Sequence, residues 1–182
     1  YLKAQVEGDK EQMIAQKMAM VSKYDIQMGD RPAMMYAGIR KTVKWVDLGT
    51  FFMESVASAS ASLGKAKVKP AGPWSGVYFK WDEVNMEADV LACFPIAAAD
   101  KGKAADLTEY ETPAGGAYWI KYLGPYEGMK SQHEALSAKL ELEGKDLNTN
   151  VVEEYLTNPG TEKDSTKYET NIIYLATAKT AL

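Results

Sequence analysis

The sequence predicts an α+β domain built from two pseudo-symmetric β-α-β-β modules, with antiparallel strands, a helix on each module and a central ligand cleft. The order strand, helix, strand, strand can be read twice along the chain. Gly64 and Gly144, which follow the two helices, are 80 positions apart (144 minus 64). Pro95 and Leu175, in the two final strands, are also 80 positions apart (175 minus 95). Because one module alone leaves a sheet face uncovered, we expect the two modules to pack together.

The first 30 residues differ from the rest, and we expect them to form a lead-in helix and a linker. The apolar residues of this segment approximate helical spacing: Met13, Ile14, Met18 and Val21. Gly29 and Pro32 then mark a break. The chain starts at Tyr1 rather than Met, so the alternative interpretation is that this segment ends a preceding domain.

The domain itself is expected over residues 31–182, with halves of about 31–100 and 101–182. In the first half, β-branched and aromatic residues predict a strand over 34–46. Asp47 is a suitable N-cap for a helix that ends near Leu63. A Pro- and Gly-containing loop follows, and then two strands at 76–82 and 87–96.

The second half repeats this order. An aromatic-rich strand is expected at 115–123, and a helix at about 127–143 with Gly144 as its cap. Two further strands are expected at 151–156 and 168–176, joined by a polar loop.

Composition excludes several classes of protein. The chain has 182 residues, 46% of them hydrophobic and 25% charged, which is typical of a globular domain. A net charge of −4 without a basic cluster argues against direct contact with nucleic acid, and no apolar run approaches the roughly 20 residues of a membrane span. With one cysteine, Cys93, and one histidine, His133, neither an intramolecular disulfide nor a Cys- or His-rich metal site is expected. We expect no cofactor and a cytoplasmic location.

Several motifs together resemble one family. The runs at 112–118 (TPAGGAY) and 124–126 (GPY) are similar to the strand and helix entry of GyrI-like small-molecule-binding domains, the effector-binding domains of AraC-type bacterial transcription activators. The segments at 154–159 (EYLTNP) and 170–175 (TNIIYL) are similar to the later strands of that family. The resemblance covers about residues 32–176.

The resemblance implies a cleft that binds hydrophobic, often cationic, small molecules, and some relatives hydrolyse cyclopropanoid compounds with an acidic residue and a tyrosine. The family's acidic residue on the last strand falls on Asn171 here. A neutral amide neither attracts a cation nor acts as a base, so the resemblance favours a neutral or weakly charged ligand and a receptor without catalytic residues. Glu169, two residues earlier on the same strand face, is a possible substitute.

Alternation along the strands and the 80-residue offset give the candidate ligand-binding residues. If Asn171 faces the cleft, Ile172 and Tyr174 face the helices instead. Aromatic side chains complete the set because they offer large contact areas and can stack on flat or cationic ligands. The candidates are Tyr36, Trp45, Trp74, Tyr78, Leu91, Cys93, Trp119, Glu154, Tyr155, Glu169, Asn171 and Ile173.

Three functions follow from this set. The first is binding of a hydrophobic or amphipathic small molecule, for sensing or sequestration. The second is a cleft hydrolase with Glu169 or Glu154 as base and a tyrosine as proton partner. The third is an interaction module of a larger protein, with a domain preceding Tyr1. Glu153 and Glu154 together suggest a solvated edge, and His133 reads as a packed or surface residue, although relatives that bind heme make an axial ligand conceivable.

Overall fold

The computed structural model describes residues 2–147 and 150–178. Its helices are α1 (Leu2–Ser22), α2 (Leu48–Lys65) and α3 (Lys130–Leu142), with short 3-10 turns before α2 and α3. Its strands are β1 (Gln27–Arg31), β2 (Met34–Lys44), β3 (Ser75–Asp82), β4 (Glu87–Ile96), β5 (Thr108–Thr112), β6 (Gly115–Leu123), β7 (Lys145–Leu147), β8 (Val151–Tyr155) and β9 (Glu169–Ala178).

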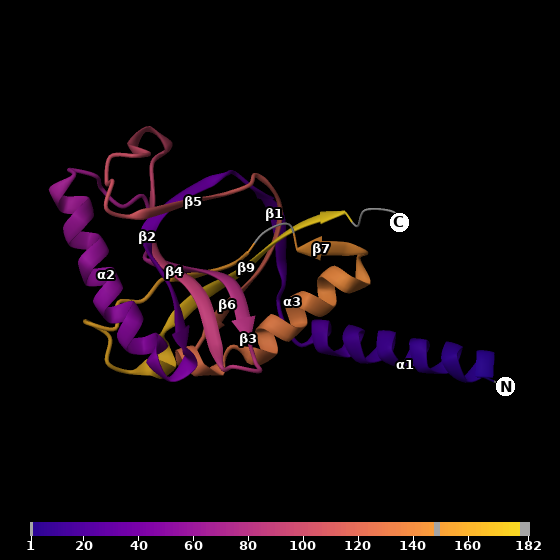
Figure 1. Ribbon diagram of the computed structural model, residues 1–182. Coiled ribbons are helices and arrows are strands. Elements are labelled where there is room, and N and C mark those ends of the chain that lie inside the picture. The colour runs from indigo at the N-terminus through magenta and orange to yellow at the C-terminus, as the bar shows by residue number, and fades with distance from the viewer. Residues whose placement is uncertain (1, 148–149, 179–182) are drawn as a thin grey trace.

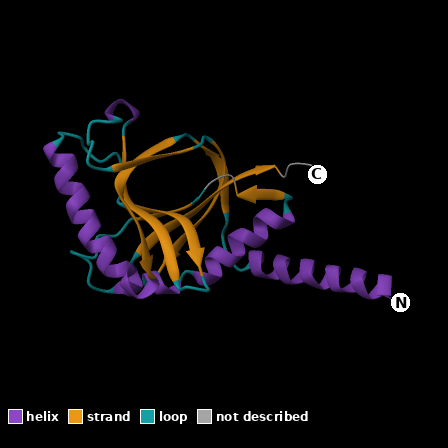
Figure 2. Ribbon diagram, in the orientation of Figure 1, coloured by secondary structure: helices purple, strands orange, loops and turns teal. Residues whose placement is uncertain are grey.

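All strands join one antiparallel sheet, which curls into a half-barrel with the helices outside it (Figures 1 and 2). The strand order is β1-β6-β9-β8-β3-β4-β2-β5, and β7 pairs with β9. The order β-α-β-β occurs as β2-α2-β3-β4 and, with the short strand β7 inserted after the helix, as β6-α3-β8-β9. The predicted fold class is confirmed. The two units meet in the middle of the sheet, where β3 pairs with β8.

The sequence did not predict three of these strands, which are β1, β5 and the short β7. Residues 27–31, expected to be a linker, form β1, and residues 108–112 form β5. These two strands are exchanged: β1 precedes the first unit but pairs with β6, and β5 precedes the second unit but pairs with β2. The exchange ties the two halves together at both edges of the sheet.

The outer face of the sheet is covered by α2 and α3. The buried residues of α2 are Phe51, Phe52, Ser55, Ala59 and Leu63, and those of α3 are Ala135, Leu136, Ala138 and Leu140. The two phenylalanines of α2 and both buried leucines of α3 pack against outward-facing strand residues such as Val90, Ile120 and Ile172. Leu63 packs in a separate cluster with Met35 and Ile96. This periodic burial is what the amphipathic pattern of the two helices dictates.

The inner face has its own core, to which no helix contributes. Its buried members are Tyr36, Val77, Leu91, Cys93, Ala117, Val152, Ile173 and Leu175. The strong curl brings backbones close together here. A Cβ on Gly38 would lie 1.9 Å from the carbonyl oxygen of Ala92, so only glycine fits at this point of β2.

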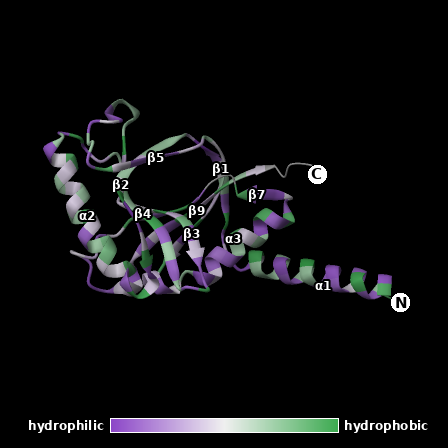
Figure 3. Ribbon diagram, viewed as in Figure 1, coloured by the Kyte–Doolittle hydropathy of each residue, from purple (hydrophilic) through white to green (hydrophobic). Residues whose placement is uncertain are grey.

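Helix α1 stands away from the sheet and contacts the rest of the molecule beside α3 (Figure 1). None of its residues is buried, and apolar and polar side chains alternate along its length (Figure 3). Lys17 forms an ion pair with Glu141 of α3, and Met20 packs on the outer core. Among the described residues, no helix combines the length and apolar character that crossing a membrane requires.

Candidate functional site

A large groove runs along the outer face of the sheet, between α2 and α3. It encloses about 2360 Å³ and crosses the seam where β3 meets β8. Both helices begin near this seam and diverge over the two halves of the sheet (Figure 1), and residues along both helices line the groove. Concave, apolar sites between packed elements with a few polar groups are the usual form of small-molecule pockets.

Aromatic rings form most of the groove wall at the seam. The ring of Trp74 lies 4.3 Å from that of Tyr155, measured between centroids, and the ring of Tyr126 lies 5.3 Å from that of Tyr155. Phe52 of α2 meets Tyr155 edge-on at 5.6 Å. Gly76 of β3 makes this packing possible, because a Cβ there would lie within 3.0 Å of Phe52, Tyr78 and Tyr155.

The carboxylate of Glu153 lies in the floor of this aromatic groove. Glu153 is on β8, between β9 and β3, and only 7% of its surface is exposed. Its Oε1 accepts a hydrogen bond from the Tyr155 hydroxyl at 3.1 Å, and its Oε2 lies 3.2 Å from Nε2 of His133 on α3. A buried carboxylate requires such partners.

The partners of Glu153 are themselves held by further hydrogen bonds. The hydroxyls of Tyr78 and Tyr155 are 2.8 Å apart, and since Tyr155 donates to Glu153, Tyr78 donates to Tyr155. Nδ1 of His133 lies 2.8 Å from the Tyr174 hydroxyl. The two ring nitrogens of His133 therefore link the Glu153 carboxylate on one side to the Tyr174 hydroxyl on the other.

Burial keeps the phenols of this cluster protonated. It raises the pKa of Tyr155 well above its ordinary value, and the negative charge of Glu153 raises it further. Burial likewise raises the pKa of Tyr174 to about 12. Burial also raises the pKa of Tyr126 to about 12. The Tyr126 hydroxyl is buried and has no hydrogen-bond partner in the described part of the chain. The floor of the groove therefore combines the buried carboxylate of Glu153 with phenol donors.

The outer rim of the groove is a stacked pair of tryptophans. The rings of Trp45 and Trp81 are 4.6 Å apart and nearly parallel, at 16°. Around this pair the structure exposes apolar side chains: Val46, Met53, Val84 and Met86.

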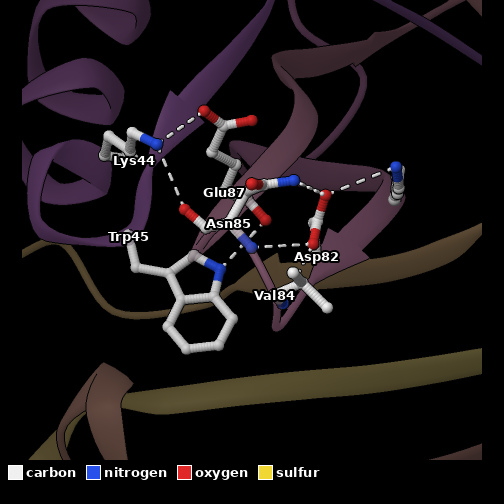
Figure 4. Close-up of polar contacts among 7 residues, drawn as sticks. Lys44, Trp45, Asp82, Val84, Asn85 and Glu87 are labelled. Carbon is white, nitrogen blue, oxygen red and sulfur yellow. Dashed lines mark hydrogen bonds and ion pairs between the residues drawn. The ribbon is translucent and has the colours of Figure 1, made fainter.

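Hydrogen bonds of the β3–β4 turn hold this rim in place (Figure 4). The Asp82 carboxylate accepts from the backbone N–H groups of Val84 and Asn85 and from the Asn85 amide. The indole of Trp45 donates to the carbonyl of Glu87 at 3.0 Å. The hydrogen-bonded β3–β4 turn and the carbonyl of Glu87 thus fix the position of the Trp45 ring.

The structure divides the sequence-predicted residues between the two faces of the sheet. Trp45, Trp74, Tyr78 and Tyr155 line the outer groove. Trp119, Glu154, Asn171 and Ile173 line a separate, smaller hollow on the inner face. Tyr36, Leu91 and Cys93 are fully buried in the inner core, and Glu169 lies at a partly exposed strand start, 3.8 Å from Lys121. The predicted set is therefore not one site.

Alternation was applied correctly, because Ile172 and Tyr174 do face the helices. The groove, however, lies on their face and not on the face of Asn171. Asn171 therefore does not set the charge of a ligand in the groove, and neither proposed base, Glu154 or Glu169, lines the groove.

Sequence reasoning missed Glu153 and His133. Glu153 was interpreted as part of a solvated edge, but β8 is a central strand and the side chain is buried. One signal could have identified it: Glu153 and Tyr155 are two residues apart, so they share a strand face with the aromatic cluster. In the described residues, no group of three or more His, Cys, Asp or Glu side chains is placed to hold a metal.

Comparison with known proteins gives no match in sequence: no family model matches the chain, and no curated protein does. Solved structures do match. The C-terminal domain of EcmrR has a TM-score of 0.68 at 17% identity, over 86% of this chain and 99% of that domain. EcmrR in its DNA complex matches with a TM-score of 0.70 at 15% identity, over 97% of this chain and 70% of that chain.

Two further structures have the same fold. SAV2435 bound to tetraphenylphosphonium matches with a TM-score of 0.61 at 11% identity, over 84% of this chain and 94% of that chain. A hydrolase from Listeria innocua matches with a TM-score of 0.57 at 14% identity, over 85% of this chain and 92% of that chain. The chain thus has the fold of the GyrI-like effector-binding domains, as its motifs predict.

Proposed function

We propose that this chain is a ligand-sensing domain that binds a lipophilic cation in the outer groove, against the carboxylate of Glu153. The observation that carries the proposal is a single buried carboxylate set among the rings of Trp74, Tyr126 and Tyr155. Aromatic faces attract a desolvated cation, and the carboxylate supplies the opposite charge at the floor. The structural similarity to SAV2435, whose structure contains tetraphenylphosphonium, supports this ligand class.

The groove's size and rim also suit such a ligand. A volume of about 2360 Å³ exceeds what one drug-sized molecule needs, so ligands of several shapes fit. The Trp45–Trp81 stack offers a flat apolar surface at the entrance. The similarity to EcmrR in its DNA complex supports a role as the sensing part of a transcription regulator. With a net charge of −4, the sensing part itself is not expected to contact DNA.

The experiment uses two probes of one shape and opposite charge, tetraphenylphosphonium and tetraphenylborate, measured by isothermal titration calorimetry. We expect the phosphonium to bind and the borate to bind far more weakly. Glu153→Gln should weaken phosphonium binding by at least about tenfold, which corresponds to roughly 1.4 kcal/mol, because the charge is lost while the shape is kept. Trp45→Ala should weaken the binding of both probes.

The matched control is Glu154→Gln. It changes the same residue type one position along β8, on the opposite face, and should leave phosphonium affinity unchanged. Equal binding of the two probes, or equal phosphonium affinity in Glu153→Gln and the parent chain, would refute the proposal. Circular dichroism of both variants establishes that they are folded.

A second candidate function is hydrolysis of an electrophilic ligand in the same groove. The observation that favours it is the hydrogen bond between Tyr155 and Glu153, with His133 on the other carboxylate oxygen. This arrangement supplies a general base and proton donors within one cluster. The similarity to the Listeria hydrolase agrees with it. Turnover of a cyclopropanoid substrate that disappears in Glu153→Gln supports this function, and equal turnover in variant and parent excludes it.

A further inference from the structure

A second hollow lies on the inner face of the sheet, on the other side of the strands from the groove. It encloses about 280 Å³ and is formed by four neighbouring strands, β1, β6, β9 and β8. Its lining residues are Asp30, Arg31, Trp119, Glu154, Asn171 and Ile173. A volume just below the range for drug-sized ligands fits a molecule with the size of a single amino acid.

The polar side of the hollow contains an ion pair that crosses the inside of the half-barrel. Nη2 of Arg31, from the end of β1, lies 3.2 Å from Oε2 of Glu154 on β8 and 3.4 Å from the Tyr36 hydroxyl. The two charged side chains are largely buried, with 20% and 14% of their side-chain surface exposed. Asn171 is the register partner of Glu154 on the neighbouring strand, so its amide lies beside the pair.

Much of the hydrogen-bonding capacity at this point is unused by the described residues. Nη2 is the only nitrogen of the Arg31 guanidinium that donates to a side chain, which leaves Nε and Nη1 available. Oε1 of Glu154 and the Asn171 amide likewise have no side-chain partner among the contacts of the described chain. A free guanidinium N–H donates to a carboxylate oxygen, and carboxylate and amide oxygens accept from an ammonium group.

The other side of the hollow is apolar. Trp119 of β6 and Ile173 of β9 are register partners, and both line it. The indole ring reaches as far as Gly29, where an added Cβ would lie 3.4 Å from the ring. The hollow thus places opposite charges a few ångströms apart at one end and an aromatic and an aliphatic side chain at the other.

We propose that the inner hollow is a second binding site, which takes a small zwitterion with a short aliphatic tail, of the chemistry of a free α-amino acid. Its carboxylate accepts a hydrogen bond from Nη1 of Arg31, and its ammonium group binds the carboxylate of Glu154 and the amide oxygen of Asn171. Its tail lies over Trp119 and Ile173. This inference goes beyond the cation groove and does not depend on it, because the sheet separates the two sites.

The pairing of charges selects a zwitterion over a simple ion. A ligand that carries only an amine is repelled by the positive charge of Arg31. A ligand that carries only a carboxylate is repelled by the negative charges of Glu154 and Asp30. Both repulsions are strong at short range in a partly buried site. A zwitterion matches both signs. Its two groups also replace the water that these side chains lose when the hollow fills.

The test uses L-leucine and its two half-molecules, 3-methylbutylamine and 4-methylpentanoate, at the same millimolar concentrations. Binding is followed by ¹H–¹⁵N nuclear magnetic resonance on the full chain. We expect L-leucine to cause saturable shifts of the Trp119 indole and the Asn171 amide signals, and neither half-molecule to saturate them. Glu154→Gln and Asn171→Ala should each lower the affinity for L-leucine by at least about tenfold.

Glu153→Gln is the matched control, because it alters the outer face of the same strand and should leave the L-leucine shifts unchanged. The proposal is wrong if L-leucine gives no saturable shift, if a half-molecule binds as well as L-leucine, or if Asn171→Ala binds L-leucine like the parent. The tetraphenylphosphonium titration reports on the groove separately. Loss of phosphonium binding with L-leucine binding retained would reject the groove function alone, and the reverse would reject only the second site.

Discussion

Replacement of Gly76 by alanine tests whether the groove depends on close packing at the seam. A Cβ at this position would lie 2.9 Å from Cζ of Phe52, 2.9 Å from Cε2 of Tyr78 and 3.0 Å from the Tyr155 hydroxyl. Real Cβ contacts essentially never come closer than 3.0 Å, so at least one of these side chains must move. Overpacking of this kind costs about 1–3 kcal/mol.

For a chain of this length each kcal/mol lowers the melting temperature by about 2–4 °C, so Gly76→Ala should lower it by roughly 2–12 °C. Differential scanning calorimetry without ligand measures the change. Gly116→Ala is the matched control, since a Cβ on that strand glycine would have its nearest neighbour at 3.8 Å. It should be neutral or slightly stabilising, because alanine loses less backbone entropy than glycine.

A second change should reverse the effect. Phe52→Leu removes one of the three close contacts, so Gly76→Ala combined with Phe52→Leu should lose less stability than the sum of the two single changes. If Gly76→Ala melts at the same temperature as Gly116→Ala, the packing at the seam is not as described. Strict additivity of the double variant would exclude Phe52 as the side chain that is displaced.

Two other expectations concern titratable groups elsewhere. Backbone hydrogen bonds from the β3–β4 turn lower the pKa of Asp82 from its ordinary value of 3.8 to about 2. The stability that this carboxylate contributes is therefore present above pH 4 and is lost as the pH falls towards 2. Asp82→Asn should therefore flatten the acid side of a plot of melting temperature against pH, and an unchanged slope would contradict the turn geometry. Burial raises the pKa of the Cys93 thiol far above its ordinary value, so it should react with a disulfide reagent at pH 8 only as fast as the chain unfolds. Rapid labelling of the folded chain would show that the inner core opens.

The repeated elements could be predicted because local signals mark them. Helix α2 carries an apolar face and ends at Lys65, next to Gly64, although Asp47 before it makes no side-chain capping hydrogen bond. Strand β9 contains a continuous apolar run with β-branched residues. The sequence did not predict β1 and β5, because their residues are mostly polar and the strands with which they pair lie far away in the sequence. β1 pairs with β6 through residues such as Gln27 and Trp119, and no local pattern reports such a contact.

The site could be predicted only in part for a different reason. Alternation assigns residues to two faces but does not say which face holds a pocket. In most sheets one face is buried and the other is wet, whereas this sheet buries apolar residues on both. From the sequence, Asn171 and Glu153 are therefore equally good candidates for a ligand-binding residue. Only the path of the helices decides that Glu153 lies in the groove.

The exchanged edge strands have a mechanical consequence. Helix α1 continues into β1, and β1 is hydrogen-bonded to β6 of the second half, while α1 itself contacts α3 of that same half. The N-terminal helix is therefore attached to the second half by backbone and side chains alike, although it precedes the first half in sequence. Any rigid-body shift of the second half relative to the first would carry the 21-residue helix α1 with it.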